Sequence, residues 1–229
     1  MNPGFYVTPE QLVRDRAEFA RKGIARGRSI LAMEYEKGVL MLAENPGGSL
    51  HKISEVYDRI AFAGVGRYNE FETLRKAGIR QADVMGYLYS RDDVTALGLA
   101  TAFSQTLGVI FSHETKPFEV ELLICELGEN GQPNQMLQIS YDGTLLEGRG
   151  VVAIGGKADI LGEGLRERFR DGLELDAALR LGMKVFAETE RRPLDGWEAA
   201  VLERGPARRC FRRLAGPELE RASAQALSS

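Results

Sequence analysis

The sequence predicts an α+β protein in which two sheets pack face to face between two layers of helices, a four-layer αββα sandwich with an extra N-terminal helix. Apolar, strand-like segments come in groups joined by short turns, as in antiparallel hairpins. Pairs of helical segments separate these groups, so two helices are available to cover each sheet. Helices do not alternate singly with strands, which disfavours a doubly wound parallel sheet.

Length and composition fit one large globular domain or two small ones. The chain has 229 residues, of which 44% are apolar and 28% charged, and its net charge of −3 implies no bulk affinity for nucleic acid. Two basic runs, at 21–28 and 208–213, are interpreted as solvated faces. No apolar run approaches the roughly 18–20 residues of a membrane span, and residues 1–7 lack the pattern of a signal peptide. Cys125 and Cys210 form no disulfide or zinc pattern, so a reducing, cytoplasmic location without membrane contact is expected.

The first segments predict a short irregular stretch followed by a helix. Residues 1–7, which include a proline, a glycine and two aromatic residues, are expected to be irregular. A helix should then begin with Thr8 as N-cap, Pro9 in the first helical position and Gln11 closing a capping box. Apolar residues follow at helical spacing, and Gly23 can end the helix.

Turn residues and apolar spacing divide the rest of the chain into strands and helices. In chain order we expect strands at 29–35, 38–44, 52–56 and 59–65, helices at 68–89 and 92–111, strands at 118–127, 136–142 and 151–156, helices at 157–171 and 174–190, strands at 197–203 and 208–215, and a short closing helix from 217.

Two of these segments have compositions that predict their surroundings. The helix that starts at Asp92 or Asp93 and runs to about Phe111 is apolar on nearly every side, so we expect it to be buried between layers. The strand at 118–127 is rich in carboxylates, so we expect a sheet edge or hairpin with alternate side chains in solvent.

The sequence offers few groups for metal or hydrolytic chemistry. His51 and His113 are the two histidines, and neither has a carboxylate or cysteine at ligand spacing, so no metal site is expected. The chain has no G-x-S-x-G nucleophile elbow, and the glycines at 64–66 and 155–156 precede no phosphate-binding pattern. These glycines are interpreted as packing positions. No catalytic residue and no cofactor are therefore expected.

Lys52 is the residue whose role is most open. It follows the polar turn at 44–49 and begins an alternating strand. Such a lysine is either a surface or salt-bridged residue, a catalytic group on a strand, or a ligand-binding group on a scaffold that does no chemistry. Spacing alone does not decide between these interpretations.

Longer motifs resemble a known family. The segments TPEQLVRDRAEFARKGIARGRS, GVLMLAENPGGSLHKISEVYDRIAFAGVGRYNEFETLRKAGI, KPFEVELL and YDGTLLE are similar to segments of proteasome α subunits from bacteria that carry proteasomes. The resemblance extends from about Tyr6 to about Ala215. It implies the sandwich of N-terminal-nucleophile (Ntn) hydrolases, which has the same four layers that the segment order predicts.

The resemblance implies a scaffold that has lost its nucleophile. In catalytic β subunits of this family, processing exposes an N-terminal threonine on the first strand, with an aspartate and a lysine nearby. The matching positions here are Arg28–Ser29, Glu44 and Lys52. Ser29 follows a capped helix and a basic linker, so we expect a non-catalytic subunit of a threonine-type endopeptidase complex. The alternatives are an active hydrolase of the same fold, an unrelated small-molecule enzyme with a buried lysine, and a free-standing binding module.

In α subunits of the family, the matching lysine lines a pocket between neighbouring subunits of a ring. There it pairs with the terminal carboxylate of an ATPase tail, a role that suits a compact charge on a flexible stem. The missing side chain at Gly66 would let the backbone of the tail approach. The resemblance places four residues in this pocket: Lys52, Gly66, Arg26 and Gly27.

The resemblance also implies an assembly. Seven copies would form an outer ring that templates a ring of β subunits, restricts the access of unfolded polypeptide to the proteolytic chamber and docks an ATPase unfoldase. Residues 1–8 are expected to be a flexible gate, 9–218 a single α-type domain and 219–229 a C-terminal helix or tail. The gate residues would be Pro3, Phe5, Tyr6 and Val7.

Overall fold

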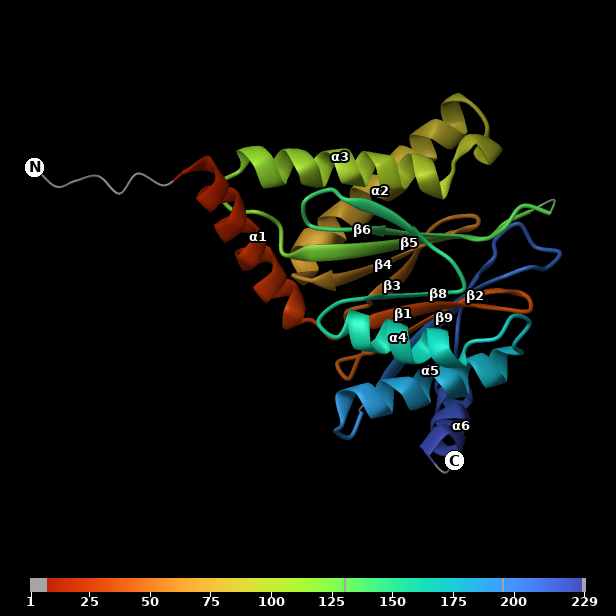
Figure 1. Cartoon of the computed structure of the whole chain (residues 1–229). Coiled ribbons are helices and arrows are strands. Elements are labelled where there is room, and N and C mark those ends of the chain that lie inside the picture. Colours follow the sequence, from red (N-terminus) through yellow and green to blue (C-terminus); the bar gives the residue numbers. More distant parts are fainter. Residues whose placement is uncertain (1–7, 130, 195, 228–229) are drawn as a thin grey trace, which may run out of the picture.

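The computed structural model describes residues 8–129, 131–194 and 196–227, which form a helix–sheet–sheet–helix sandwich with one helix across its end (Figure 1). The predicted αββα class is thereby confirmed. The predicted gate residues, Pro3, Phe5, Tyr6 and Val7, lie outside the described residues. Within the described ranges, no helix has the length and apolarity needed to cross a lipid bilayer.

The first sheet has five strands in the order β10-β9-β2-β1-β8, paired in antiparallel fashion. The predicted hairpin of residues 29–44 is present and lies at the centre of this sheet, with Tyr35 opposite Gly38 across the turn. The strands are β1 (Ile30–Tyr35), β2 (Gly38–Glu44), β8 (Val151–Ile154), β9 (Trp197–Glu203) and β10 (Phe211–Arg213).

The second sheet has the order β3-β4-β5-β6-β7, so the carboxylate-rich strand, predicted to form a sheet edge or a hairpin, lies in the middle and forms a hairpin with β6. The prediction that its alternate side chains lie in solvent is wrong, because the carboxylates of β5 are held inside the protein rather than by water. Glu121 accepts hydrogen bonds from Gln138 Nε2 (2.6 Å) and Gly155 N (2.7 Å), and Glu126 accepts one from Ala96 N (2.7 Å). The strands are β3 (Ile53–Tyr57), β4 (Ile60–Gly66), β5 (Val120–Glu126), β6 (Gln135–Ile139) and β7 (Leu145–Gly148).

Helices cover the outer faces of both sheets, and apolar clusters fill the three spaces between layers (Figure 1). Packed against the second sheet are α2 (Tyr68–Leu88) and α3 (Ala96–His113), joined through a 3₁₀ turn at Arg91–Asp93. Packed against the first sheet are α4 (Ala158–Arg168), α5 (Leu175–Glu190) and α6 (Gly216–Leu227).

The surroundings and the start of α3 differ from the prediction. Its N-cap is Thr95, whose Oγ1 accepts a hydrogen bond from Gly98 N at 3.2 Å, while Asp92 and Asp93 belong to the preceding turn. The helix lies in an outer layer, and its far side leaves Leu97 and Val109 exposed in the single chain. Its all-round apolarity therefore does not reflect burial between layers of the same chain.

The N-terminal helix α1 (Pro9–Ala25) closes one end of the space between the sheets (Figure 1). Thr8 caps it as predicted, accepting a hydrogen bond from Gln11 N at 3.2 Å. The helix continues past Gly23, because Ala20 and Ile24 are buried in the cluster between the sheets. A Cβ at Gly23 would lie 2.0 Å from Glu119 Oε2, so this glycine allows close packing rather than ending the helix.

Candidate functional site

Lys52 lies immediately before β3, on a backbone that is held from both sides. Its N–H donates to Glu198 Oε2 at 3.0 Å, and its carbonyl accepts from Gly64 N at 3.1 Å. The side chain is partly buried, and its Nζ donates to the carbonyl oxygen of Arg28 at 3.3 Å. The ammonium is therefore placed beside the linker that joins α1 to β1.

The electrostatic setting of Lys52 makes its charge responsive to pH. Burial, followed by the positive charge of Arg28, lowers the pKa of Lys52 from 10.5 to about 8, while Glu198 and Glu44 act in the opposite direction. The ammonium form still predominates at pH 7, but it is poorly solvated. A carboxylate that approached it would supply the missing counter-charge.

Glu44, which ends β2, does not give its carboxylate to Lys52. It is 1% exposed and pairs with two guanidinium groups. Arg28 Nη1 lies 2.7 Å from Oε1, and Arg192 Nη1 and Nη2 donate at 2.8 and 2.5 Å. The acid predicted at this position is thus present, and it orders the linker before β1 and the loop before β9.

Glu198 is a site residue that the sequence analysis missed. Its buried carboxylate on β9 accepts hydrogen bonds from Asn45 Nδ2 (2.7 Å), Arg213 Nη1 (2.7 Å) and Ile53 N (3.2 Å), besides that from Lys52 N. One carboxylate therefore holds both ends of the turn that carries Lys52. The only signal in the sequence is a charged residue inside the apolar strand WEAAVLE.

The structure brings Gly27 and Gly66 together near Lys52. Gly66 has a φ of 107°, and a Cβ there would lie 1.9 Å from the carbonyl oxygen of Glu119. A Cβ at Gly27 would lie 2.5 Å from Val65 Cγ1 and 3.1 Å from Gly66 N. Both positions need glycine for the fold itself, whatever else approaches them. Arg26 is the exposed C-cap residue of α1, next to Gly27.

Ser29, at the position of the nucleophile, is built into the fold. It is 2% exposed, and its Oγ accepts a hydrogen bond from Lys157 N, before α4, at 3.2 Å. Its own nitrogen is in a peptide bond with Arg28, so it carries no amine that could act as a base. Among the described residues, no group of three or more His, Cys, Asp or Glu side chains could hold a metal ion.

Fold and site together define a class of protein. Two antiparallel sheets between helix layers, with an acid ending β2 and a lysine just before β3, make up the Ntn-hydrolase sandwich. Here an internal serine stands in place of a terminal nucleophile. The family can be named more closely. The model of the proteasome subunit family matches residues 24–203, and the chain belongs to that family.

The relatives agree on the type of subunit. A protein named proteasome subunit alpha from Streptosporangium roseum is 52% identical over 225 residues, covering 97% of this chain and 87% of that protein. The proteins of the same name from Thermomonospora curvata and Sanguibacter keddieii are 50% and 51% identical, and each alignment covers 96% of this chain and 97% or 89% of the relative. The chain is therefore similar over nearly its whole length to bacterial proteasome α subunits.

Proposed function

We propose that this chain is the non-catalytic α subunit of a proteasome core particle in the cytoplasm. Seven copies form an outer ring that templates the β ring, restricts the access of unfolded polypeptide and docks an ATPase unfoldase. The observation that carries the proposal is the state of the catalytic positions. Lys52 and an acid at residue 44 persist, whereas Ser29 is buried, internal and bonded to the backbone before α4.

Docking of the ATPase tail is assigned to Lys52, with Gly66, Gly27 and Arg26 around it. The supporting features are the poorly solvated ammonium and its rigid backbone. A terminal carboxylate would gain a charge-assisted hydrogen bond to a lysine whose position is already fixed, so little ordering entropy is lost on binding. The carboxylate of Glu44 pairs with two arginines, and the carboxylate of Glu198 accepts hydrogen bonds from the turn at 45–53. The hydrogen bond of Lys52 Nζ goes to the carbonyl oxygen of Arg28.

Contact with β subunits is assigned to the connection between α2 and α3, at the end of this helix layer that points away from α1 (Figure 1). This corner leaves large apolar side chains in solvent, and Tyr87 is 88% exposed. A cluster of exposed apolar side chains like this one is typical of an interface that is covered on assembly. The exposed residues are Val84, Met85, Tyr87, Leu88 and Tyr89.

The gate is assigned to residues 1–7, which precede the firm Thr8 cap. A capped helix fixes the point where such a segment begins, so the segment can order or disorder without disturbing the domain.

The experiment that tests the proposal is reconstitution with the β subunit of the same organism. Native mass spectrometry should show heptameric α rings stacked on β rings, and peptide hydrolysis should be unchanged by Ser29→Ala in the α chain. Purified α chain alone should not hydrolyse peptides. A mature chain that begins at Ser29, or activity that Ser29→Ala abolishes, would instead establish the active hydrolase.

A further inference from the structure

The amine of Lys52 differs from most other lysine amines of the described chain in what it contacts. Four lysines form ion pairs with carboxylates: Lys22 with Glu18, Lys76 with Glu72, Lys116 with Glu70, and Lys157 with Glu190. Lys52 Nζ instead donates to an uncharged acceptor, the carbonyl oxygen of Arg28, at 3.3 Å. A long hydrogen bond to a neutral oxygen is easily exchanged, so the amine can leave this contact at small cost.

The surroundings of Lys52 also favour a neutral amine. Burial, and then the positive charge of Arg28, lower the pKa of Lys52 to about 8 against the opposing effects of Glu198 and Glu44. At pH 7.5 about a quarter of the Lys52 side chains are therefore neutral, compared with about one in a thousand for a lysine with the ordinary pKa of 10.5. The neutral amine is the nucleophilic form, so Lys52 can attack an electrophile at physiological pH.

The side chains around Lys52 are mainly positive. Three arginines pair with the two buried carboxylates of the site: Arg28 and Arg192 with Glu44, and Arg213 with Glu198. With Lys52 they make four cationic groups against two anionic ones. His51, whose Nδ1 lies 3.3 Å from Glu198 Oε1, adds a further positive charge when it is protonated. The three arginine side chains are 35–39% exposed, so a small anion can reach them from solvent.

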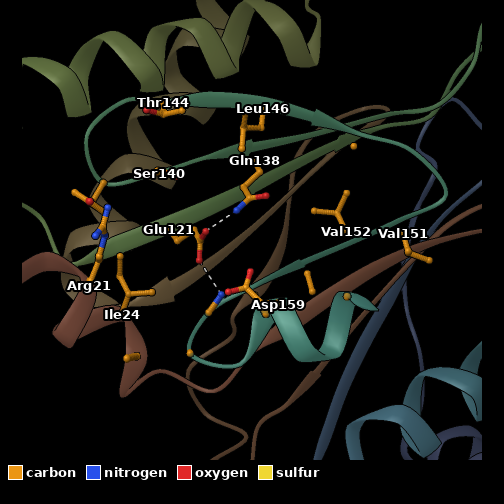
Figure 2. A pocket seen from close by; sticks show the side chains of 18 of the residues that line it. Arg21, Ile24, Glu121, Gln138, Ser140, Thr144, Leu146, Val151, Val152 and Asp159 are labelled. Atoms are coloured by element: carbon orange, nitrogen blue, oxygen red, sulfur yellow. Dashed lines mark hydrogen bonds between the residues drawn. The ribbon is translucent and has the colours of Figure 1, made fainter. Parts of the chain in front are cut away.

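A cleft of about 880 Å³ at the β7–β8 edge of the sandwich has the opposite charge (Figure 2). The charged residues that line it are Arg21, Arg166, Glu121, Asp142, Glu147 and Asp159. Lys157 stands between Gly156 and Ala158, two residues that also line this cleft, and it pairs with Glu190. An anionic reagent should therefore be disfavoured near Lys157 and attracted to Lys52.

We propose that Lys52 is a modification site that acyl phosphates acylate without an enzyme, and that the acyl group prevents docking of the ATPase tail. The neutral Nζ attacks the carbonyl carbon of the acyl phosphate, and the bond from that carbon to the phosphate oxygen breaks. Phosphate leaves with the electron pair of this bond and takes the proton that the amine gives up. The product is a neutral amide, which lacks the charge that a terminal carboxylate would pair with.

Arg28 is the residue that would hold the phosphate. Its side chain is 39% exposed, and its Nη1 pairs with Glu44 at 2.7 Å. A guanidinium has five N–H donors, so this pairing does not exhaust them, and its fork suits phosphate oxygens. The acylation itself depends only on the single chain, whereas its effect on docking rests on the proposed function.

The first test incubates the purified α chain with acetyl phosphate and measures acetylation of each lysine by peptide mass spectrometry. At pH 7.5, Lys52 should react roughly tenfold or more faster than Lys184, which is also half-buried, and than Lys157 beside the acidic cleft. Its rate should level off above about pH 8, and inorganic phosphate should slow it. Acetylation of Lys52 no faster than that of Lys184, or a rate that still rises steeply at pH 10, would overturn the proposal.

A second test examines the class of reagent. Arg28→Gln should slow acetylation of Lys52 roughly fivefold or more and leave that of the exposed Lys37 unchanged. Faster reaction of Lys184 would show that this variant is unfolded, and competition by phosphate in the parent then decides the role of Arg28. A neutral thioester, N,S-diacetylcysteamine, should prefer Lys52 over Lys37 less strongly than acetyl phosphate does. An equal preference would overturn the assignment to acyl phosphates.

The effect on docking is measured on the assembled α–β particle. Treatment with acetyl phosphate should weaken its binding of an isolated ATPase-tail peptide roughly tenfold or more. A Lys52→Arg particle, which keeps the charge but has no amine to acetylate there, is the control, and the same treatment should not change its affinity. Unchanged binding by the acetylated parent would refute the effect on docking. A parent particle that binds no peptide before treatment would refute the proposed docking itself, and with it this effect, but not the acylation.

Discussion

Replacing Lys52 with methionine should stabilise the isolated chain and abolish its capacity to bind a carboxylate. A pKa lowered from 10.5 to about 8 means that folding with a charged Lys52 costs about 3 kcal/mol at pH 7. Methionine removes this cost, and it also removes the hydrogen bond to the carbonyl of Arg28, which is worth about 1 kcal/mol. We therefore expect Lys52→Met to raise the free energy of unfolding by about 2 kcal/mol at pH 7.

The pH dependence gives the sharper check. The folded-state pKa is below the unfolded one, so the cost is fully present below about pH 8, falls as the pH rises toward 10.5, and is absent only above that pH, where Lys52 is neutral in both states. Urea denaturation should show the largest advantage of the variant at pH 6–7.5. The advantage should be lost as the pH rises toward 10.5, and above that pH the variant should be about 1 kcal/mol less stable than the parent, because only the loss of the hydrogen bond to the carbonyl of Arg28 remains. Lys37→Met, in the β1–β2 turn, is the control. A variant less stable than the parent at pH 7 would show that Glu44 and Glu198 make the ammonium a net stabilising group.

Three further outcomes are expected. Lys52→Ala should weaken binding of an isolated ATPase-tail peptide to the assembled ring roughly tenfold or more, whereas the control Lys37→Ala should bind the peptide normally. The affinity of the parent ring for the peptide should fall with added salt and as the pH rises through about 8. An unchanged affinity in Lys52→Ala would refute the pocket assignment. Gly66→Ala should destabilise the chain by about 3 kcal/mol or more in urea denaturation, because its Cβ would meet Glu119 O at 1.9 Å with φ at 107°, and near-parent stability would contradict that packing. Deleting residues 2–7 should raise peptide hydrolysis by the assembled particle, and a fully assembled truncated particle with the parent rate would show that this segment is not the gate.

The order of layers could be predicted because it depends on local patterns. Hairpin turns such as Glu36–Lys37, the Thr8 cap and the spacing of apolar residues all act over a few residues, and the structure agrees with each. The position of strand β5 within the second sheet could not be predicted in the same way. The carboxylates of β5 suggested a sheet edge or hairpin with side chains in solvent. Their actual partners, Gln138, Gly155 and Ala96, are distant in sequence, so no local pattern showed that these carboxylates are held inside the protein.

The site residues that lie within one continuous family motif could be predicted from the sequence. The site residue that reaches Lys52 from a distant strand could not. Lys52 and Gly66 stand at fixed places in a continuous motif, and the structure brings them to one end of the sandwich. Glu198 joins this site from a strand 146 residues further along the chain, through its bond to Lys52 N. No period or spacing connects two such positions, so only the folded arrangement of β9 beside β2 shows the contact.

The helix that closes the end of the sandwich has a consequence for how such a chain can evolve. Ala20 and Ile24 of α1 complete the apolar layer between the sheets, and Gly23 is fitted against Glu119. Introducing a threonine at residue 29 would not recreate a peptidase, because exposing its amine requires cutting off the helix that covers this layer. Each residue adapted to the helix makes its loss more damaging to the fold. A chain packed in this way cannot shed the helix without exposing the apolar layer between its sheets.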